Sequence, residues 1–205
     1  NHLYYVENAS QLEDFDFDML LKELEALELE FPQFAFENSP SKRVGGDITK
    51  KFETVRHRFP MLSLSNTYSE EEISEWVTRV QKLVSEPIDF VCELKYDGVA
   101  IGIHYENGQL KKAVTRGDGE KGEDVTNNVK TIRAIPLQLS NDFPLDFEIR
   151  GEIFMPHAQF QRINLEREAI GEQPFANPRN TASGTLKLQD SKLVAERGLD
   201  SYLYG

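Results

Sequence analysis

The sequence has few features that would anchor it in a membrane or outside the cell. Its 205 residues include a single cysteine, Cys92, so the chain can form no internal disulfide. It has no apolar run long enough to span a bilayer, and it shows no secretory signal pattern. These absences exclude a membrane span and a disulfide-stapled scaffold, and they favour the cytoplasm. We expect Cys92 to be a small buried hydrophobe.

Positive charge is also scarce. The chain has 23 Lys and Arg against 35 Asp and Glu, for a net charge of −12. This balance argues against an autonomous nucleic-acid-binding domain, which is usually basic. It still allows a piece of a nucleic-acid enzyme that grips DNA elsewhere in a longer protein. The first residue is Asn and the last ones read as a strand, so we expect a fragment. The four histidines lack metal-ligand spacing.

The N-terminal third contains two predicted helices with a linker between them. Apolar residues recur at three- and four-residue spacing up to about residue 31, and Pro32 ends that pattern. Turn-forming residues at 37–47 predict a linker. Ser69 and Glu72 form a capping-box pattern, which predicts the start of a second helix.

Alternating residues then predict three successive strands, at 88–97, 99–105 and 109–115. Asn107 and Gly108 form a strong two-residue hairpin signal between the last two. The strands, followed by further helices, predict an α+β fold.

The hairpin turn also predicts a register. If Glu106 faces Gln109, then Val99 faces Arg116. Arg116 would therefore lie beside Asp97, one strand away from the preceding segment.

The second half of the chain continues this mixed pattern. Residues 117–124 are Gly-rich and charged, and they lead into a predicted helix that contains Val125 and Ile132. Alternation at 145–156 predicts a strand whose acidic and basic residues share one face, and 157–170 predict a helix. The stretch at 175–188 reads as a polar loop rich in turn residues.

The stretch "CELKYDGVAIG" suggests chemistry. In a strand, Glu93, Lys95 and Asp97 would share one face. A lysine can act as a covalent nucleophile when it is partly deprotonated and held in place, although the two acids favour its charged form. The alternative is a solvated ladder of weak ion pairs. Gly98 allows a sharp turn and close approach of a ligand, which favours a site.

The residues Lys95 to Gly98 match the Lys-x-Asp-Gly motif of covalent nucleotidyltransferases, which include polynucleotide ligases and mRNA-capping enzymes. Longer stretches narrow the match. The chain resembles the NAD-dependent DNA ligases of bacteria in "CELKYDGVAI", "TRGDGEKGEDVTNNVKTIRAIP", "EIRGEIFMP", "FANPRNTASGTL" and the upstream "SPSKRVGG" and "FPMLSLSN". The resemblance covers essentially the whole chain, in the family's order and spacing.

The resemblance implies a reaction and a set of site residues. Lys95 attacks the α-phosphate of NAD, nicotinamide mononucleotide (NMN) leaves, and the AMP of the lysyl-AMP passes to the 5′-phosphate of nicked DNA. Asp97 lies beside the reacting centre. The resemblance places Asp118, Arg179 and Asn180 in signature loops. The implied nucleotide-binding residues are Glu93, Ser63, Leu64, Glu152, Arg116 and Tyr204.

The resemblance also divides the chain. Residues 1–40 look like the C-terminal part of a small helical domain that recognises NMN, and 41–205 look like a truncated adenylation domain, an antiparallel-rich nucleotidyltransferase core. The matching N-terminal residues are Tyr4, Tyr5, Asp14, Phe17 and Asp18. Three positions depart from the family: Tyr5 stands for a common His, Phe17 for Tyr, and Lys187 for Arg.

The expected substrates and partners follow from the same resemblance. They are NAD with Mg²⁺, and nicked double-stranded DNA through the full-length protein, with Zn²⁺ only in the absent C-terminal part. We expect a monomer that binds no membrane, and a fragment unable to ligate alone. Two alternatives are a nucleotidyltransferase that uses ATP or GTP and a non-catalytic NAD- or AMP-binding module. Covalent labelling from NAD or from ATP distinguishes the first alternative from an NAD-dependent ligase. Nick sealing by the Lys95→Ala variant tests the second.

Overall fold

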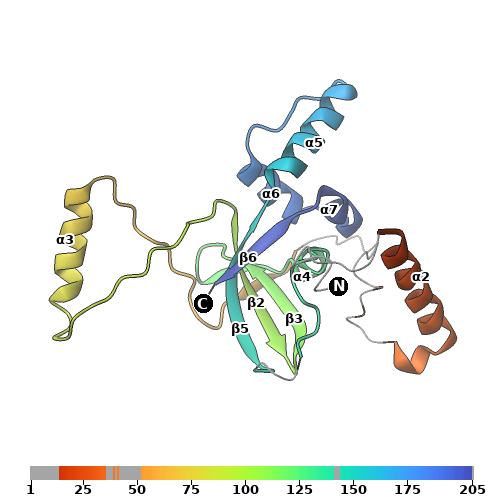
Figure 1. Ribbon diagram of the computed structural model, residues 1–205, viewed down its shortest axis with the longest axis horizontal. Coiled ribbons are helices and arrows are strands. Elements are labelled where there is room, and N and C mark those ends of the chain that lie inside the picture. Colours follow the sequence, from red (N-terminus) through yellow and green to blue (C-terminus); the bar gives the residue numbers. More distant parts are fainter. Residues whose placement is uncertain (1–13, 36–38, 40, 42–51, 141–143, 205) are drawn as a thin grey trace.

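The computed structural model describes residues 14–35, 39, 41, 52–140 and 144–204. Mixed helices and antiparallel strands confirm the predicted α+β class (Figure 1). In chain order the elements are α2 (Asp14–Glu30), η1 (Pro32–Phe34), β1 (Thr54–Arg56), α3 (Glu70–Gln81), β2 (Val99–Glu106), β3 (Gln109–Thr115), β4 (Lys121–Glu123), α4 (Thr126–Val129), β5 (Phe147–Phe154), α5 (His157–Ala169), α6 (Pro178–Leu186), α7 (Ser191–Arg197) and β6 (Asp200–Tyr204). None of the helices in the described part has both the length and the apolar content that a membrane span requires.

The centre of the molecule is an antiparallel sheet with strand order β3-β2-β5-β6. Its two middle strands bury Ile101, Ile103 and Ile153 completely on one face. That face packs against residues from α4, α6 and α7, so one hydrophobic core joins sheet and helices. Burial of this kind contributes about 25 cal/mol per Å² of apolar surface. The sheet and the helices on its core face are therefore the well-packed part of the described structure.

The hairpin between β2 and β3 confirms the predicted turn but corrects the register. Glu106 does face Gln109, yet Ile101 faces Thr115 because the register shifts between His104 and Tyr105. Lys111 is the extra residue of a β-bulge, which keeps both Leu110 and Ala113 on the core face. The predicted pairing of Val99 with Arg116 is wrong by one residue: the Arg116 backbone N–H donates to the Ala100 carbonyl, at 3.1 Å.

The second face of the sheet is polar, as the alternation in β5 predicted. Glu148, Arg150 and Glu152 point to this face, while Ile149 and Ile153 point to the core. Strands β1 and β4 form a short ribbon. This ribbon and the segment that follows β1 cover part of the polar face. The Arg150 guanidinium fixes that segment by donating to the Phe59 and Pro60 carbonyls, at 3.3 and 3.0 Å.

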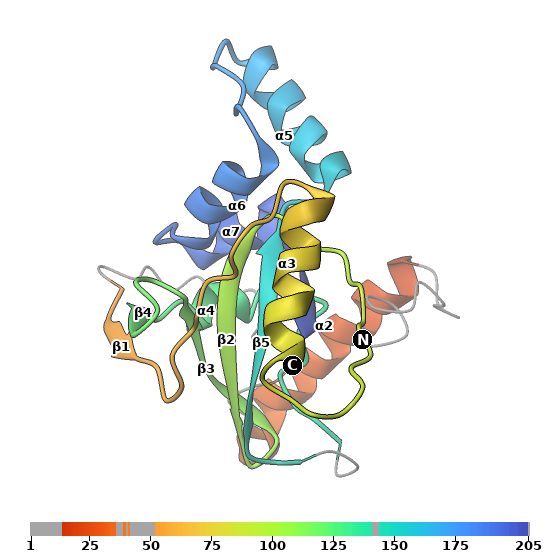
Figure 2. The same cartoon turned by 90° about the vertical axis from the view of Figure 1, so that its left-hand side faces the viewer.

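Helix α3 begins where the capping pattern predicted. The Ser69 hydroxyl accepts from the Glu72 backbone N–H, and the Glu72 carboxylate accepts from the Tyr68 N–H at 2.6 Å. No residue of the helix is buried, and Figures 1 and 2 together show it standing apart from the sheet at the end of two extended segments. Among the described residues, its Trp76 ring packs against the Phe90 ring, with the two centroids 5.4 Å apart.

The predicted strand at 88–97 is wrong. This stretch is irregular and exposed, and Cys92 is therefore exposed rather than buried. The reason lies in the partner strand. Pairing of β2 with β5 starts at Val99 opposite Ile153, and β5 ends one residue later at Phe154. The residues before Gly98 thus have no strand to pair with.

The predicted polar loop at 175–188 is also wrong, since most of it forms α6. The Asn177 side chain caps this helix by accepting from the Asn180 N–H at 2.7 Å, and Pro178 occupies the first turn. The predicted helix after residue 124 is shorter than expected, with only Thr126–Val129 helical. The predicted linker at 37–47 lies almost entirely outside the described residues.

Candidate active site

The Lys95 segment joins the sheet at Gly98. The Gly98 backbone N–H donates to Glu152 Oε1 at 3.1 Å. A Cβ atom here would lie 2.2 Å from the Ile153 carbonyl oxygen, so only glycine lets the chain pass this close to β5. The sequence predicted that a ligand would approach closely at Gly98. In the structure it is strand β5 that lies this close. This contact anchors the end of the lysine motif to the strand that carries Glu152.

Asp97 is held from the other side by helix α6. The Arg179 guanidinium in the first turn of this helix lies 2.7 Å from Asp97 Oδ1. Lys95, by contrast, forms no ion pair with any described carboxylate, and its side chain is exposed. The ladder of ion pairs along Glu93, Lys95 and Asp97 is therefore absent from the described part of the chain. The Lys95 amine is left accessible to an incoming group.

Glu152 is the electrostatic centre of this region. It is half-buried, and burial raises the pKa of its carboxyl above the usual range. The Gly98 N–H and the positive charges of Lys95 and Arg179 act in the opposite direction, while Asp97 adds to the rise. All of these groups lie close enough to influence one carboxylate, so the structure brings the predicted residues Lys95, Asp97 and Glu152 together.

Arg116 approaches from the turn that follows β3. Its carbonyl accepts from the Gly119 N–H at 3.0 Å and lies 3.1 Å from His57 Nε2, which fixes the turn. Its guanidinium donates to the Ser63 hydroxyl at 3.3 Å. Two predicted site residues from segments far apart in the chain thus touch each other.

Asp118 stabilises the same turn. Its carboxylate accepts from the backbone N–H groups of Lys121 and Glu120, at 2.9 and 3.0 Å. These two bonds, the Lys121 one first, lower the pKa of the Asp118 carboxyl below its usual value. Asp118 therefore shapes the loop that carries Arg116.

Tyr204 completes the group from β6, where it pairs with Arg150 on β5. Burial and the negative charge of Glu152 raise the pKa of its hydroxyl, while Arg150 and Arg116 oppose the rise. Tyr204 has 46% of its surface exposed, so it is accessible to a ligand. Arg116, Glu152 and Tyr204 consequently share one neighbourhood on the polar face of the sheet.

Other predicted residues are not brought into contact with this group. Glu93 and Leu64 are exposed, and the structure gives Glu93 no hydrogen bond or ion pair with the described residues. Asn180 contributes its backbone N–H to the cap of α6. Asp14, Phe17 and Asp18 lie in α2, which is described only through its backbone there, and Tyr4 and Tyr5 lie outside the described residues.

Lys187 forms an ion pair with Glu123 on β4. The positive charge of Lys187, where the family commonly has Arg, is therefore paired with a carboxylate of the same chain.

Sequence reasoning missed an aromatic cluster beside the lysine. The Tyr96 ring stacks on Tyr202 of β6, with centroids 3.9 Å apart, and Tyr202 in turn stacks on Phe154 at 5.0 Å. Tyr202 and Phe154 occupy even-numbered positions, which form the polar face. This alternation is the sequence signal that could have placed both rings on that face. Their pairing depends on how β6 aligns with β5, and no local pattern encodes that alignment.

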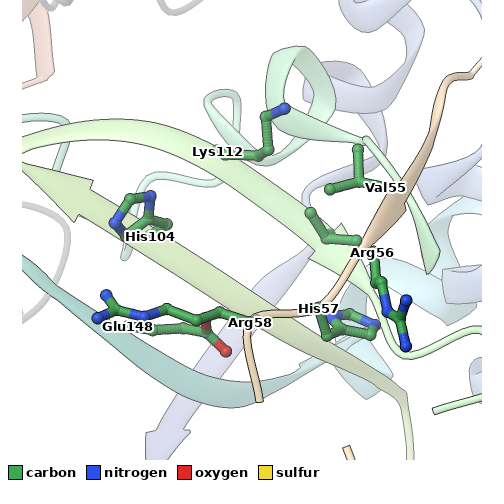
Figure 3. A pocket seen from close by; sticks show the side chains of 9 residues that line it. Val55, Arg56, His57, Arg58, His104, Lys112 and Glu148 are labelled. Carbon is green, nitrogen blue, oxygen red and sulfur yellow. The ribbon is translucent and has the colours of Figure 1, made fainter. Parts of the chain in front are cut away.

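The polar face also contains a pocket of about 120 Å³, shown in Figure 3. Gly102 and His104 form its floor at the hairpin half of β2, away from the Gly98 end. Glu148 reaches in from β5, and its buried Oε1 has no hydrogen-bond partner among the described residues. The pocket is also lined by basic side chains, those of Arg56, His57, Arg58 and Lys112. The pocket shares no lining residue with the group around Lys95, although His57 in its wall contacts the Arg116 carbonyl.

The described residues provide no ready-made metal centre. No three His, Cys, Asp or Glu side chains among them lie close enough together to hold an ion.

Two family models match the chain. One, described as the NAD-dependent DNA ligase adenylation domain, matches residues 49–205. The other, described as a DNA ligase-like N-terminal NAD+-binding domain, matches residues 1–45. Together the two matches cover nearly the whole chain in the order that the sequence motifs suggested.

Curated relatives are similar along the full chain. A DNA ligase of Cytophaga hutchinsonii is 57% identical over 205 residues, one of Bacteroides fragilis is 58% identical and one of Flavobacterium psychrophilum is 54% identical. Each match covers 100% of this chain and 31% of the relative. The chain therefore spans about a third of the length of these proteins.

Proposed function

The chain belongs to the NAD-dependent DNA ligases, and on that premise we propose that Lys95 is the nucleophile that attacks the α-phosphate of NAD. A bond forms between the Lys95 Nζ and the α-phosphorus, and the bond from that phosphorus to the bridging oxygen breaks. The bridging oxygen leaves with NMN and carries the electron pair. The amine gives up a proton, and AMP stays on the lysine as a phosphoramide.

The observation that carries this proposal is the convergence of Lys95, Asp97, Glu152, Arg116 and Tyr204 at one end of the polar face. A covalent phosphoryl transfer relies on positioning and on stabilising phosphate charge. This group offers an accessible amine, a guanidinium, a carboxylate and an aromatic face. Those are the partners that a nucleotide's phosphate, ribose and base require.

The proposed roles follow from the contacts. Glu152 already accepts from Gly98 with one oxygen, and its second oxygen would accept from the ribose hydroxyls. Arg116 would exchange its bond with Ser63 for a phosphate oxygen, because a guanidinium binds a charged phosphate more strongly than a neutral hydroxyl. Tyr204 would stack on adenine. Asp97, held by Arg179, would stay beside the reacting amine.

The remaining predicted contacts are part of the same proposal. Glu93, Ser63 and Leu64 would line the adenine end. On the N-terminal side the NMN half of the substrate would meet the residues Tyr4, Tyr5, Asp14, Phe17 and Asp18.

Mg²⁺ fits this arrangement as an ion that arrives with the substrate. It commonly binds through one or two carboxylates, water and substrate phosphates, so no protein cage is needed. When bound it would add positive charge beside the phosphates. Asp97 and Glu93 each lie two residues from Lys95, and Asp97 would have to leave Arg179 in part to serve as a ligand.

For the whole protein we propose transfer of AMP to the 5′-phosphate of nicked DNA, followed by strand sealing. The acidic chain has little positive surface of its own, so we assign most of the DNA contact to the remaining two thirds of the protein. A cytoplasmic location and a monomeric state complete this proposal.

The test offers adenylate-labelled NAD and, separately, α-phosphate-labelled ATP to the full-length protein that carries this chain. We expect covalent label from NAD and none from ATP. Lys95→Ala should abolish the label, while Lys111→Ala, an exposed lysine on β3, should keep it. Label from ATP alone, or label that survives Lys95→Ala, would contradict the proposal.

A further inference from the structure

The segment that carries Lys95 makes few contacts with the rest of the described structure. Val91 and Leu94 have 85% and 80% of their surface exposed. Tyr96 is different, with 37% exposed, because its ring lies against the sheet. Among the described residues, the stretch 91–97 is held, apart from its junction at Gly98, by this ring and by the Asp97–Arg179 ion pair. Exposed ion pairs contribute little, so the ring is the stronger candidate for a fixed contact.

The partner of Tyr96 belongs to the rigid sheet. Tyr202 pairs with Glu152 across β5 and β6, and its ring also stacks on Phe154 at the end of β5. The planes of Tyr96 and Tyr202 differ by 20°, and those of Phe154 and Tyr202 by 7°. The Phe154–Tyr202 distance is within the range usual for stacked aromatic pairs, and the Tyr96 and Tyr202 rings are in still closer contact. The stack therefore links the residue after Lys95 to the strand position opposite Glu152.

The two tyrosine side chains also interact electrostatically. The Tyr96 side chain, through its charge and a hydrogen bond, raises the pKa of the Tyr202 hydroxyl. This agrees with the close approach of the two rings.

We propose that Tyr96 and Tyr202 are positioning residues that dock the lysine motif onto the sheet and so place Lys95 for attack on the nucleotide. The proposal rests on the proposed function of Lys95. Tyr96 is the chain neighbour of Lys95, and a fixed Tyr96 backbone confines the amine to the region that one lysine side chain can reach. Tyr202 is likewise tied to Glu152, which would hold the ribose. The stack thus couples the nucleophile to the substrate-binding strand.

This role predicts a specific kinetic pattern. Groups that already make the binding contacts are untouched, so the affinity for NAD should change by no more than about threefold. The rate of lysyl-AMP formation at saturating NAD should fall about 10- to 100-fold, because misplacing a reacting atom by about 1 Å has effects of this size. Tyr96→Phe and Tyr202→Phe keep the rings and should retain rates within about threefold of the original protein.

The experiment measures single-turnover lysyl-AMP formation against NAD concentration in the full-length protein. It uses Tyr96→Leu, Tyr202→Leu, the double variant and the two phenylalanine variants. Tyr68→Leu is the matched control, because Tyr68 is a tyrosine with 85% of its surface exposed and no place in the stack. The double variant should be no slower than the slower single variant, since either change alone breaks the same contact.

The outcomes separate the two proposals. Absence of label in the unmodified protein would refute the function of Lys95 itself. Normal label in that protein, with unchanged rates in both leucine variants, would overturn only the positioning role. A loss that appears in NAD affinity alone, or that persists in the phenylalanine variants, would also overturn it. Thermal unfolding of each variant checks folding, and Tyr96→Ala replaces Tyr202→Leu if the latter is unfolded, since Tyr96 lies outside the core.

Discussion

The central sheet and the segment before it differ sharply in how they are held. Ile101, Ile103 and Ile153 of the sheet are completely buried, whereas every residue from 91 to 97 is exposed. Yet the two regions meet at Gly98, within hydrogen-bonding distance of Glu152. Glu152, which is proposed to hold the ribose, lies on the packed region, and the proposed nucleophile lies on the unpacked one.

This difference suggests a division of labour. Stability comes from the buried face of the sheet and its helices, while chemistry depends on how a weakly held segment is placed over the polar face. Substitutions in the two regions should therefore have separable effects, on unfolding in one case and on reaction rate in the other.

The largest effect on stability is expected in the core. Ile103→Ala removes a completely buried side chain that neighbouring groups cannot fully replace, and it should lower the free energy of unfolding by about 2–5 kcal/mol. Leu94→Ala, at a position in the Lys95 segment with 80% exposure, should change it by less than about 0.5 kcal/mol. Urea unfolding of both variants measures the contrast. Equal losses at the two sites would erase the distinction between the regions.

The junction should respond almost as strongly. Gly98→Ala places a methyl group where only 2.2 Å separates it from the Ile153 carbonyl oxygen, and that atom belongs to a rigid strand. We expect a loss of about 1–3 kcal/mol in unfolding free energy, together with weaker label from NAD. Gly184→Ala, a helix position in α6 with open space around it, is the control and should be neutral or slightly stabilising. A Gly98→Ala variant as stable as the control would show that the junction is not tight.

The carboxylate at the centre of the site should affect binding more than folding. Glu152→Gln keeps an oxygen for the Gly98 N–H but loses the charge, and we expect about tenfold weaker NAD binding, equivalent to about 1.4 kcal/mol. Titration calorimetry measures this loss. Unchanged NAD affinity would remove Glu152 from the proposed ribose contact.

The same variant should alter the pH dependence of stability. Because burial raises the pKa of Glu152, the folded state holds this proton more tightly than the unfolded chain does. The contribution of the protonated Glu152 carboxyl to the free energy of unfolding is complete below the ordinary pKa of 4.5. It is lost as the pH rises through the raised pKa. Glu152→Gln should flatten the fall in unfolding free energy across that window. A slope identical to that of the original protein would contradict the raised pKa.

The smallest effect is expected from the exposed ion pair. Arg179→Ala should lower unfolding free energy by about 1 kcal/mol or less, because both partners are solvated. Its effect on label should be clearer, since Asp97 loses the contact that holds it beside Lys95. Asp97→Asn tests the same link from the other side. A stability loss of several kcal/mol in Arg179→Ala would mean that the Lys95 segment is packed after all.

Local signals predicted part of this fold well. The Asn107–Gly108 turn, the alternating faces of β5 and the cap of α3 all depend on neighbours in sequence, and all three are present. The bulge at Lys111 could have been read from two lysines between Leu110 and Ala113. It was missed because the hairpin was extended with strict alternation.

Other features depend on partners that the sequence does not reveal. The stretch 88–97 has a strand pattern but no strand beside it, and the polar stretch 175–188 forms a helix because Asn177 and Pro178 begin one. The hairpin alone placed Arg116 near Gly98, even with a register wrong by one residue. The role of the other site residues came only from family resemblance, and the Tyr96–Tyr202 stack came from neither source.

The central claim is that the exposed amine of Lys95 bonds to phosphorus over the packed sheet. Peptide mapping by mass spectrometry, after the full-length protein is incubated with NAD, tests it most directly. We predict a mass increase equal to one adenylate on the peptide that contains Lys95, released by acid as expected for a phosphoramide. An adenylate on any other residue, or none on a folded protein that binds NAD, would contradict the account.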